Sequence, residues 1–121
     1  MLFRSRAQIA TAVLQRAGVA QFGDIDRLTM FADNLVPHVL RLDGILEFDP
    51  DLAARINRGA LIEHDSREEI EIRACAVHCV ELIVSQRPDA NAAKIDQHLW
   101  QRGQGPRYKS SPRHRSRCTA Y

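Results

Sequence analysis

Two carboxylates stand at positions where a side chain could do chemistry. Asp33 follows Met30-Phe31-Ala32, at the end of an expected short helix and a few residues before a break at Pro37. A carboxylate there can face a cleft rather than open solvent, so Asp33 is the leading candidate for acid-base or electrostatic chemistry. Spacing alone favours a plainer interpretation, in which Asp33 is solvated or caps the next helix.

The second carboxylate, Asp96, lies close to an imidazole and an indole. It precedes His98 and Trp100 by little more than a helical turn. Residues four apart share a helix face, so Asp96 and Trp100 are placed to hold a planar, hydrogen-bonding ligand. The alternative is a solvated acid beside a tryptophan of the core.

Other polar groups have simpler explanations. Cys75, His78 and Cys79 could approach one metal ion, but a structural zinc site needs four ligands and the sequence has no second pair. We interpret the cysteines as small apolar residues of a buried helix and expect no metal. Glu69 stands four residues before Arg73, which predicts a structural ion pair.

The elements that must position these residues are all helical. Apolar periodicity and capping residues predict about six helices, over residues 3–17, 27–34, 36–42, 50–58, 67–87 and 92–102. Caps are expected at Asp24 or Asp26, Asp49, Ser66 and Asn91. The 67–87 helix is apolar over most of its circumference and is expected to be the hub of the core. We also expect Ile9, Ala12 and Val13 to share one face of the first helix, and Trp100 of the last helix to point inward.

Composition indicates a folded chain with an uneven charge distribution. The 121 residues are 45% hydrophobic and 26% charged, unlike a disordered protein. No apolar run reaches the roughly 20 residues of a membrane span, and no secretory signal begins the chain, so we expect a cytoplasmic protein. Residues 1–102 are predicted to form a helical domain, and 103–121 an irregular basic tail of the same domain. Residues 101–121 contain six basic side chains and no acidic one, which suggests an anionic partner such as phosphate, nucleic acid or the acidic body.

Several motifs in succession resemble the queuosine salvage protein family. The resemblance runs from about residue 3 to the last residue and rests on Phe3-x-x-Arg6-Ala7-Gln8-Ile9, Leu28-Thr29-Met30-Phe31-Ala32-Asp33, Pro37-x-Val39-Leu40, Ser66-Arg67-Glu68-Glu69-Ile70-Glu71-Ile72-Arg73, Val80-Glu81-Leu82-Ile83, Asp96-x-x-Leu99-Trp100 and Pro112-x-His114-Arg115-x-Arg117-x-x-x-Tyr121. Motifs in matching order are more specific than any one of them.

The resemblance implies a queuosine 5′-phosphate N-glycosidase, a hydrolase that frees queuine for tRNA modification. It implies the C-terminal part of an all-helical, DNA-glycosylase-like fold, a small nucleotide substrate and neither a metal nor another cofactor. Asp33 falls on the catalytic aspartate of the family, and Phe31 and Asp96 fall on positions that bind the base. Cleavage of an N-glycosidic bond builds positive charge on the sugar, which a carboxylate such as Asp33 can stabilise.

Two other functions stay open. The chain could be a truncated, non-catalytic helical domain that pairs with a separate N-terminal part, associates with itself or has lost activity. Ser5, Gln97 and Gln101 favour this alternative, since the family usually has lysine at the first position and often has tyrosine and aspartate at the others. A small nucleic-acid-binding module would use the arginine-rich tail, but direct binding of nucleic acid is not expected, because the run is short and lacks interleaved aromatic residues.

Overall fold

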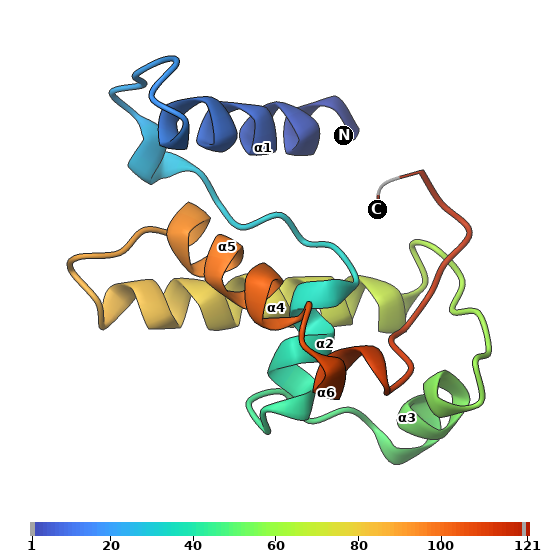
Figure 1. Cartoon of the computed structure of the whole chain (residues 1–121). Coiled ribbons are helices and arrows are strands. Elements are labelled where there is room, and N and C mark those ends of the chain that lie inside the picture. The colour runs from blue at the N-terminus through green and yellow to red at the C-terminus, as the bar shows by residue number, and fades with distance from the viewer. Residues whose placement is uncertain (1, 120) are drawn as a thin grey trace.

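The fold is built from helices (Figure 1). The computed structural model describes residues 2–119 and 121, and the side chains of residues 6–119 and 121. This part of the chain contains no strand and consists of α1 (Leu2–Arg16), the 3₁₀ turn η1 (Ile25–Arg27), α2 (Leu35–Leu42), α3 (Pro50–Asn57), α4 (Arg67–Ser85), α5 (Ala92–Arg102) and α6 (Pro106–Lys109). The predicted all-α class is therefore confirmed. None of these helices has the length and hydropathy needed to span a bilayer.

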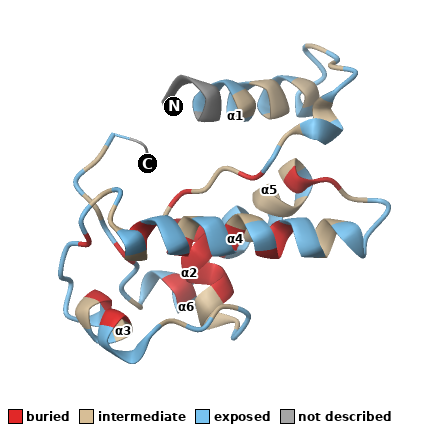
Figure 2. Ribbon diagram, turned by 180° about the vertical axis from the view of Figure 1, so that it is seen from behind, coloured by how far each residue is buried: buried red, intermediate tan, exposed pale blue. Residues whose placement is uncertain are grey.

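The core lies where α2, α4 and α5 pack together (Figure 2). α2 is the central helix, since every residue from Leu35 to Leu40 is buried. α4 buries one face against α2 and α5, and its opposite face is open, with Ile70 and Leu82 about half exposed. The expectation that α4 is buried on several sides was therefore wrong, because α2 occupies the central position.

Local capping signals fix three helix starts as predicted. Asp49 accepts hydrogen bonds from the amides of Asp51 and Leu52, ahead of the proline that begins α3. Ser66 caps α4, and Asn91 caps α5 by accepting from the amide of Lys94 at 2.9 Å. These caps act within a few residues, so the sequence alone was sufficient to predict them.

The helix predicted over residues 27–34 is absent. η1 ends at Arg27, and the chain from Leu28 to Asp33 has no helical structure. The Phe31 amide does not bond within a helix but donates to the side chain of Asp96, at Oδ2, over 2.9 Å. The segment 28–33 is thus held against α5 by a tertiary hydrogen bond.

The basic tail is more ordered than its composition indicates. It contains α6, and two of its aromatic side chains, Tyr108 and His114, are buried. The turn into the tail passes so close to α2 that a Cβ at Gly103 would lie 2.8 Å from Leu35 Cδ1, so only glycine fits without a shift. From α6 the tail runs past α3 and α4 and ends on the side of the molecule where α1 begins (Figure 1).

Candidate functional site

A cavity of about 410 Å³ lies between α1, the segment 28–33 and the first turns of α5. Its volume is in the range of small-molecule sites. It is lined by Gln8, Ile9, Ala12, Val13, Arg16, Leu28, Thr29, Phe31, Asp33, Ala93, Asp96, Gln97 and Trp100. All three predicted site residues, Phe31, Asp33 and Asp96, are in this set although they come from distant parts of the sequence.

Asp33 combines a structural contact with a place in the cavity wall. Its Oδ1 accepts hydrogen bonds from the amides of Leu35 at 3.0 Å and Val36 at 2.9 Å, the first amides of α2. The predicted capping contact is therefore present, and it coexists with a position on the cavity. The side chain is 8% exposed, and this burial raises the pKa of Asp33, against the lowering effects of the two amides and the positive charge of Arg113.

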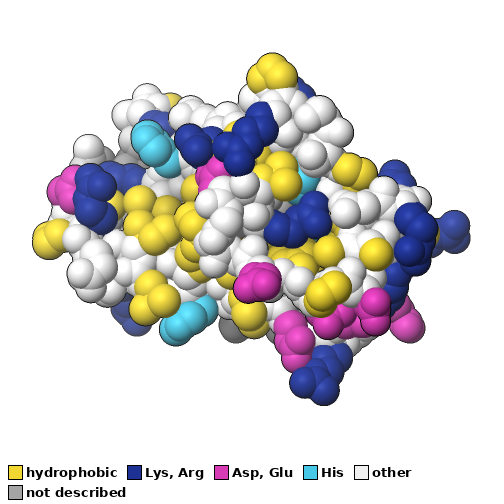
Figure 3. Space-filling model, turned by 90° about the horizontal axis from the view of Figure 1, so that it is seen from below, with side chains coloured by type: hydrophobic (Ala, Val, Ile, Leu, Met, Phe, Trp, Pro, Cys, Tyr) yellow, Lys and Arg dark blue, Asp and Glu magenta, His cyan; other side chains and the backbone are white. Residues whose placement is uncertain are grey.

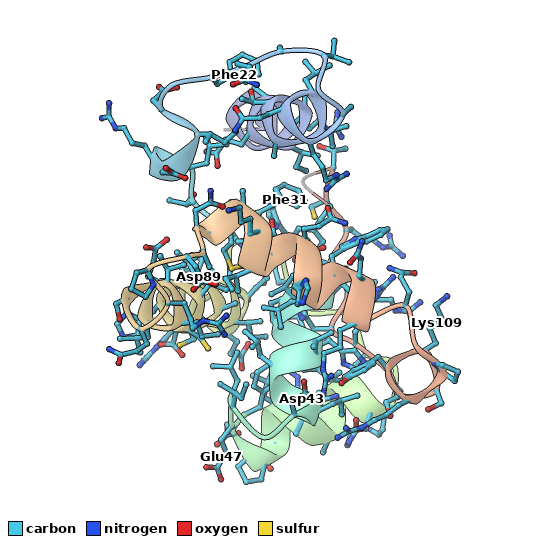
Figure 4. The ribbon with its side chains drawn as sticks, turned by 60° about the vertical axis from the view of Figure 1, so that its left-hand side comes forward. Phe22, Phe31, Asp43, Glu47, Asp89 and Lys109 are labelled. Atoms are coloured by element: carbon cyan, nitrogen blue, oxygen red, sulfur yellow. The ribbon has the colours of Figure 1, made fainter. Side chains whose placement is uncertain are left out.

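Phe31 and Asp96 are joined across the cavity floor. The amide of Phe31 donates to Asp96 Oδ2 at 2.9 Å, and this bond holds the carboxylate against the backbone of Phe31. Figure 4 shows Phe31 between α1 and α5. Burial raises the pKa of Asp96 to about 6, and the nearby charge of Asp33 adds to the rise, while the Phe31 amide opposes it. The cavity thus contains two carboxylates in a weakly solvated setting.

The α1 wall was not recognised as part of a site from the sequence. Ile9 and Val13, which were expected to share one face of this helix, both line the cavity and are about 40% exposed. Few contacts hold α1 to the rest of the molecule here, among them a hydrogen bond from Arg16 to the Gln97 side chain. An amphipathic face has the same periodicity whether it covers a core or an open cavity, so the pattern could not distinguish the two.

Trp100 was expected to point inward, and this was wrong. It lies on the cavity wall with 47% of its surface exposed. It does share this wall with Asp96, as their four-residue spacing predicted. Of the positions that depart from the family pattern, Gln97 lines the cavity, Gln101 is exposed, and the Ser5 side chain is outside the described residues.

The remaining candidate clusters have structural explanations. Cys79 is buried in the core, whereas Cys75 and His78 are exposed, so Cys75 is not the buried core residue that we expected. The predicted ion pair is confirmed, with Arg73 Nε donating to Glu69 Oε1 at 2.6 Å. His64, Asp65 and Glu69 lie close enough together to be considered as metal ligands. The guanidinium of Arg73 already bonds to the carboxylates of Asp65 and Glu69 and supplies the positive charge there.

The basic residues of the tail do not form an extended arm. Two residues of the body donate to tail carbonyls, Arg41 to that of Pro112 and Asn34 to that of His114. In the opposite direction, Arg115 of the tail donates to the carbonyl of Gly59, the residue that follows α3 and its C-cap. On the face shown in Figure 3, lysine and arginine side chains are mixed with acidic and hydrophobic ones. The tail is therefore a packed segment of the molecule.

Comparisons with known proteins agree with the motifs. The family model described as Queuosine salvage protein matches residues 1–121. Three relatives bear the name Queuosine 5′-phosphate N-glycosylase/hydrolase. The protein from Mus musculus is 34% identical over 98% of this chain and 40% of its own length, and the one from Sphaerobacter thermophilus is 37% identical over 98% and 39%. The protein from Schizosaccharomyces pombe is 39% identical over 83% and 30%. The chain thus spans about 40% or less of the length of these relatives. The chain belongs to the queuosine salvage protein family.

Proposed function

We propose that this chain binds queuosine 5′-phosphate in the cavity beside α1 and takes part in hydrolysis of its N-glycosidic bond. The observation that carries the proposal is the convergence of Phe31, Asp33 and Asp96 on one cavity. The names of the relatives support the substrate and the reaction. Since this chain spans about 40% of the length of those relatives, the proposal concerns only the part of the site present here.

Recognition of the base falls to Phe31 and Asp96. The Phe31 ring offers an apolar face on which a planar 7-deazaguanine can stack. Asp96 uses Oδ2 to accept the Phe31 amide, so Oδ1 is the oxygen available to a ligand. With a pKa of about 6, Asp96 is mostly ionised at pH 7.5, where it accepts hydrogen bonds from N–H groups of the base or pairs with the cationic amine of its side arm.

The role of Asp33 follows from the charge that develops as the bond breaks. When the C1′–N bond of the substrate breaks, its electron pair leaves with the base and the sugar becomes positively charged. Water then forms a bond to C1′ and loses a proton, and the base gains one. Both backbone hydrogen bonds of the Asp33 carboxylate are accepted by Oδ1, so Oδ2 is the oxygen that can face the sugar or orient the water.

Fixed geometry makes Asp33 suited to this role. Its carboxylate is held by two amides of a buried helix, so little reorganisation is needed when the charge develops. Burial strengthens the interaction with a cation, because less water screens it. The positive charge of Arg113 favours the ionised form that this chemistry needs.

The test is release of queuine from queuosine 5′-phosphate, measured by liquid chromatography and mass spectrometry. Asp33→Asn is expected to lower the rate by about 100-fold or more, the loss seen when one preorganised electrostatic group is removed. Asp89→Asn is the matched control, because Asp89 is exposed, pairs with Arg87 and is not among the residues that line the cavity. Release that is equal in Asp33→Asn and wild type would refute the role of Asp33. Absence of release from the wild-type chain would contradict the proposed activity and favour a non-catalytic binding domain.

A further inference from the structure

The side chain of Tyr121 contacts the buried ion pair that Glu69 and Arg73 form on α4. The Tyr121 hydroxyl donates to Glu69 Oε1 at 2.7 Å, and Glu69 is completely buried. The same carboxylate accepts from both Arg73 and the amide of Asp65. Burial acts to raise the pKa of Glu69, but these hydrogen bonds lower it to about 2, so the Glu69 carboxylate is ionised at all ordinary pH values.

His114 contacts both Tyr121 and the start of α2. Its ring packs edge-on against the ring of Tyr121, with centroids 6.0 Å apart, and it is 2% exposed. Its carbonyl accepts from Asn34 Nδ2 at 3.3 Å. Asn34 directly follows Asp33 and is the N-cap residue of α2. A contact of the tail therefore lies one residue from the proposed catalytic carboxylate.

The preceding tail residue, Arg113, is the chain neighbour of His114, so its backbone also lies near the start of α2. Its side chain is exposed, and its positive charge favours a lower pKa of Asp33. The tail is fixed on this side of α2 by two further contacts, from Arg41 to the carbonyl of Pro112 and between His38 and the carbonyl of Tyr108. Beyond His114, the carbonyl of Thr119 accepts from Arg6 of α1, the helix that forms the other cavity wall.

We propose that Tyr121 is a positioning residue for Asp33: by bonding to Glu69 it fixes the tail, keeps the carbonyl of His114 on Asn34 at the start of α2, and so sets the position of the adjacent Arg113. Arg113 then influences the site although it does not line the cavity. A catalytic role for Tyr121 rests on the proposed function of Asp33. The effect of the tail on the titration of Asp33 can be measured without any substrate.

The charged groups around Asp33 define what such a measurement reports. Asp96 on α5 is the acidic neighbour, Arg16 of α1 lines the same cavity, and Arg113 is the tail residue. Removing the Arg113 charge leaves burial and the α2 amides as the main influences on Asp33. Since an adjacent cation favours the carboxylate, its loss shifts the Asp33 titration to higher pH.

The experiment is a carbon-13 NMR titration of the aspartate carboxyl groups, with Asp33→Asn to assign the signal of Asp33. Arg113→Gln and Tyr121→Phe are both expected to shift the Asp33 midpoint upward, and Arg113→Lys to restore it. Arg117→Gln is the matched control, since it removes the same charge from the exposed tail four residues further on, and it is expected to leave the midpoint unchanged. In the double variant with Arg113→Gln, Tyr121→Phe is expected to add no further shift, because the tail acts on Asp33 through Arg113.

Amide chemical shifts in the same samples report whether the tail remains docked. An Asp33 midpoint that stays at its wild-type value in Arg113→Gln would overturn the proposal, whatever the activity of the chain. A midpoint that is unchanged in Tyr121→Phe would also overturn it, whether the tail amides move or stay in place. If the shifts occur as expected but no queuine is released by the wild type, the positioning contact stands and the proposed function fails.

Discussion

Replacing Asp33 by asparagine and by alanine is expected to separate the two functions that its carboxylate combines. Oδ1 accepts two hydrogen bonds from the first amides of α2, at 3.0 and 2.9 Å. Asparagine retains an oxygen that can accept both, and asparagine and aspartate are equally good helix caps. Alanine leaves both amides without this partner.

The magnitude follows from the number and burial of these bonds. Loss of a capping side chain costs about 0.5–2 kcal/mol, and a buried amide without a partner costs about 1–3 kcal/mol. Because Asp33 lines the cavity, water can reach part of the vacated space, so the expected loss for Asp33→Ala is about 1–3 kcal/mol. For Asp33→Asn we expect a change within about 0.5 kcal/mol, because the cap is retained and the cost of burying a charge is removed.

The assay is urea unfolding at pH 7.5, followed by circular dichroism, for the wild type and both variants. The expected order of stability places Asp33→Ala clearly below the other two. An Asp33→Asn protein as unstable as Asp33→Ala would refute the reasoning, because it would show that the charge and not the capping oxygen holds α2. An unchanged Asp33→Ala protein would refute it as well.

Two further predictions concern Asp96 in the cavity and Gly103 in the turn into the tail. Burial raises the pKa of Asp96 from 3.8 to about 6, so its protonated form stabilises the fold below about pH 4 and this contribution is lost as the pH rises through 6. Asp96→Asn is therefore expected to be more stable than wild type by about 1–2 kcal/mol at pH 7.5, an advantage that disappears near pH 4 in urea titrations; an advantage that is equal at both pH values would contradict the assignment. Gly103→Ala forces Leu35 and Val39 to move and should cost about 1–2 kcal/mol, whereas Gly23→Ala, with no atom within 4 Å of its added Cβ, should unfold like wild type; equal stability of the two variants would argue against a tight approach at Gly103.

The sequence was sufficient where structure depends on neighbours within one turn. Asp49 before Pro50, Ser66 before Glu69 and Asn91 each fixed a helix start. The segment after η1 could not be predicted in the same way, because the group that accepts from the Phe31 amide is Asp96, 65 residues later. The α6 turn was hidden by the polar, arginine-rich composition of the tail around the buried Tyr108.

The candidate site was accessible only in part. Family motifs singled out Phe31, Asp33 and Asp96, while spacing alone favoured plainer interpretations of Asp33 and Asp96. Their convergence could not be predicted, since it depends on how the segment 28–33 crosses α5. The influence of Arg113 was equally hidden, because it arises from a tail that folds back over α2 across 80 residues of sequence.

The central claim, that the cavity beside α1 binds the base, can be tested with the single tryptophan of the chain. Trp100 lines the cavity and is half exposed, so its fluorescence reports a ligand bound there. Titration with queuine is expected to give a saturable change in emission for wild type and for Phe22→Ala, an aromatic control that does not line the cavity and lies on the side of α1 away from Phe31 in Figure 4. In Phe31→Ala the affinity is expected to fall by about 10-fold or more, since stacking of a base on an aromatic ring contributes about 1–3 kcal/mol. No saturable change in the wild type, or equal affinity in Phe31→Ala and wild type, would contradict the claim.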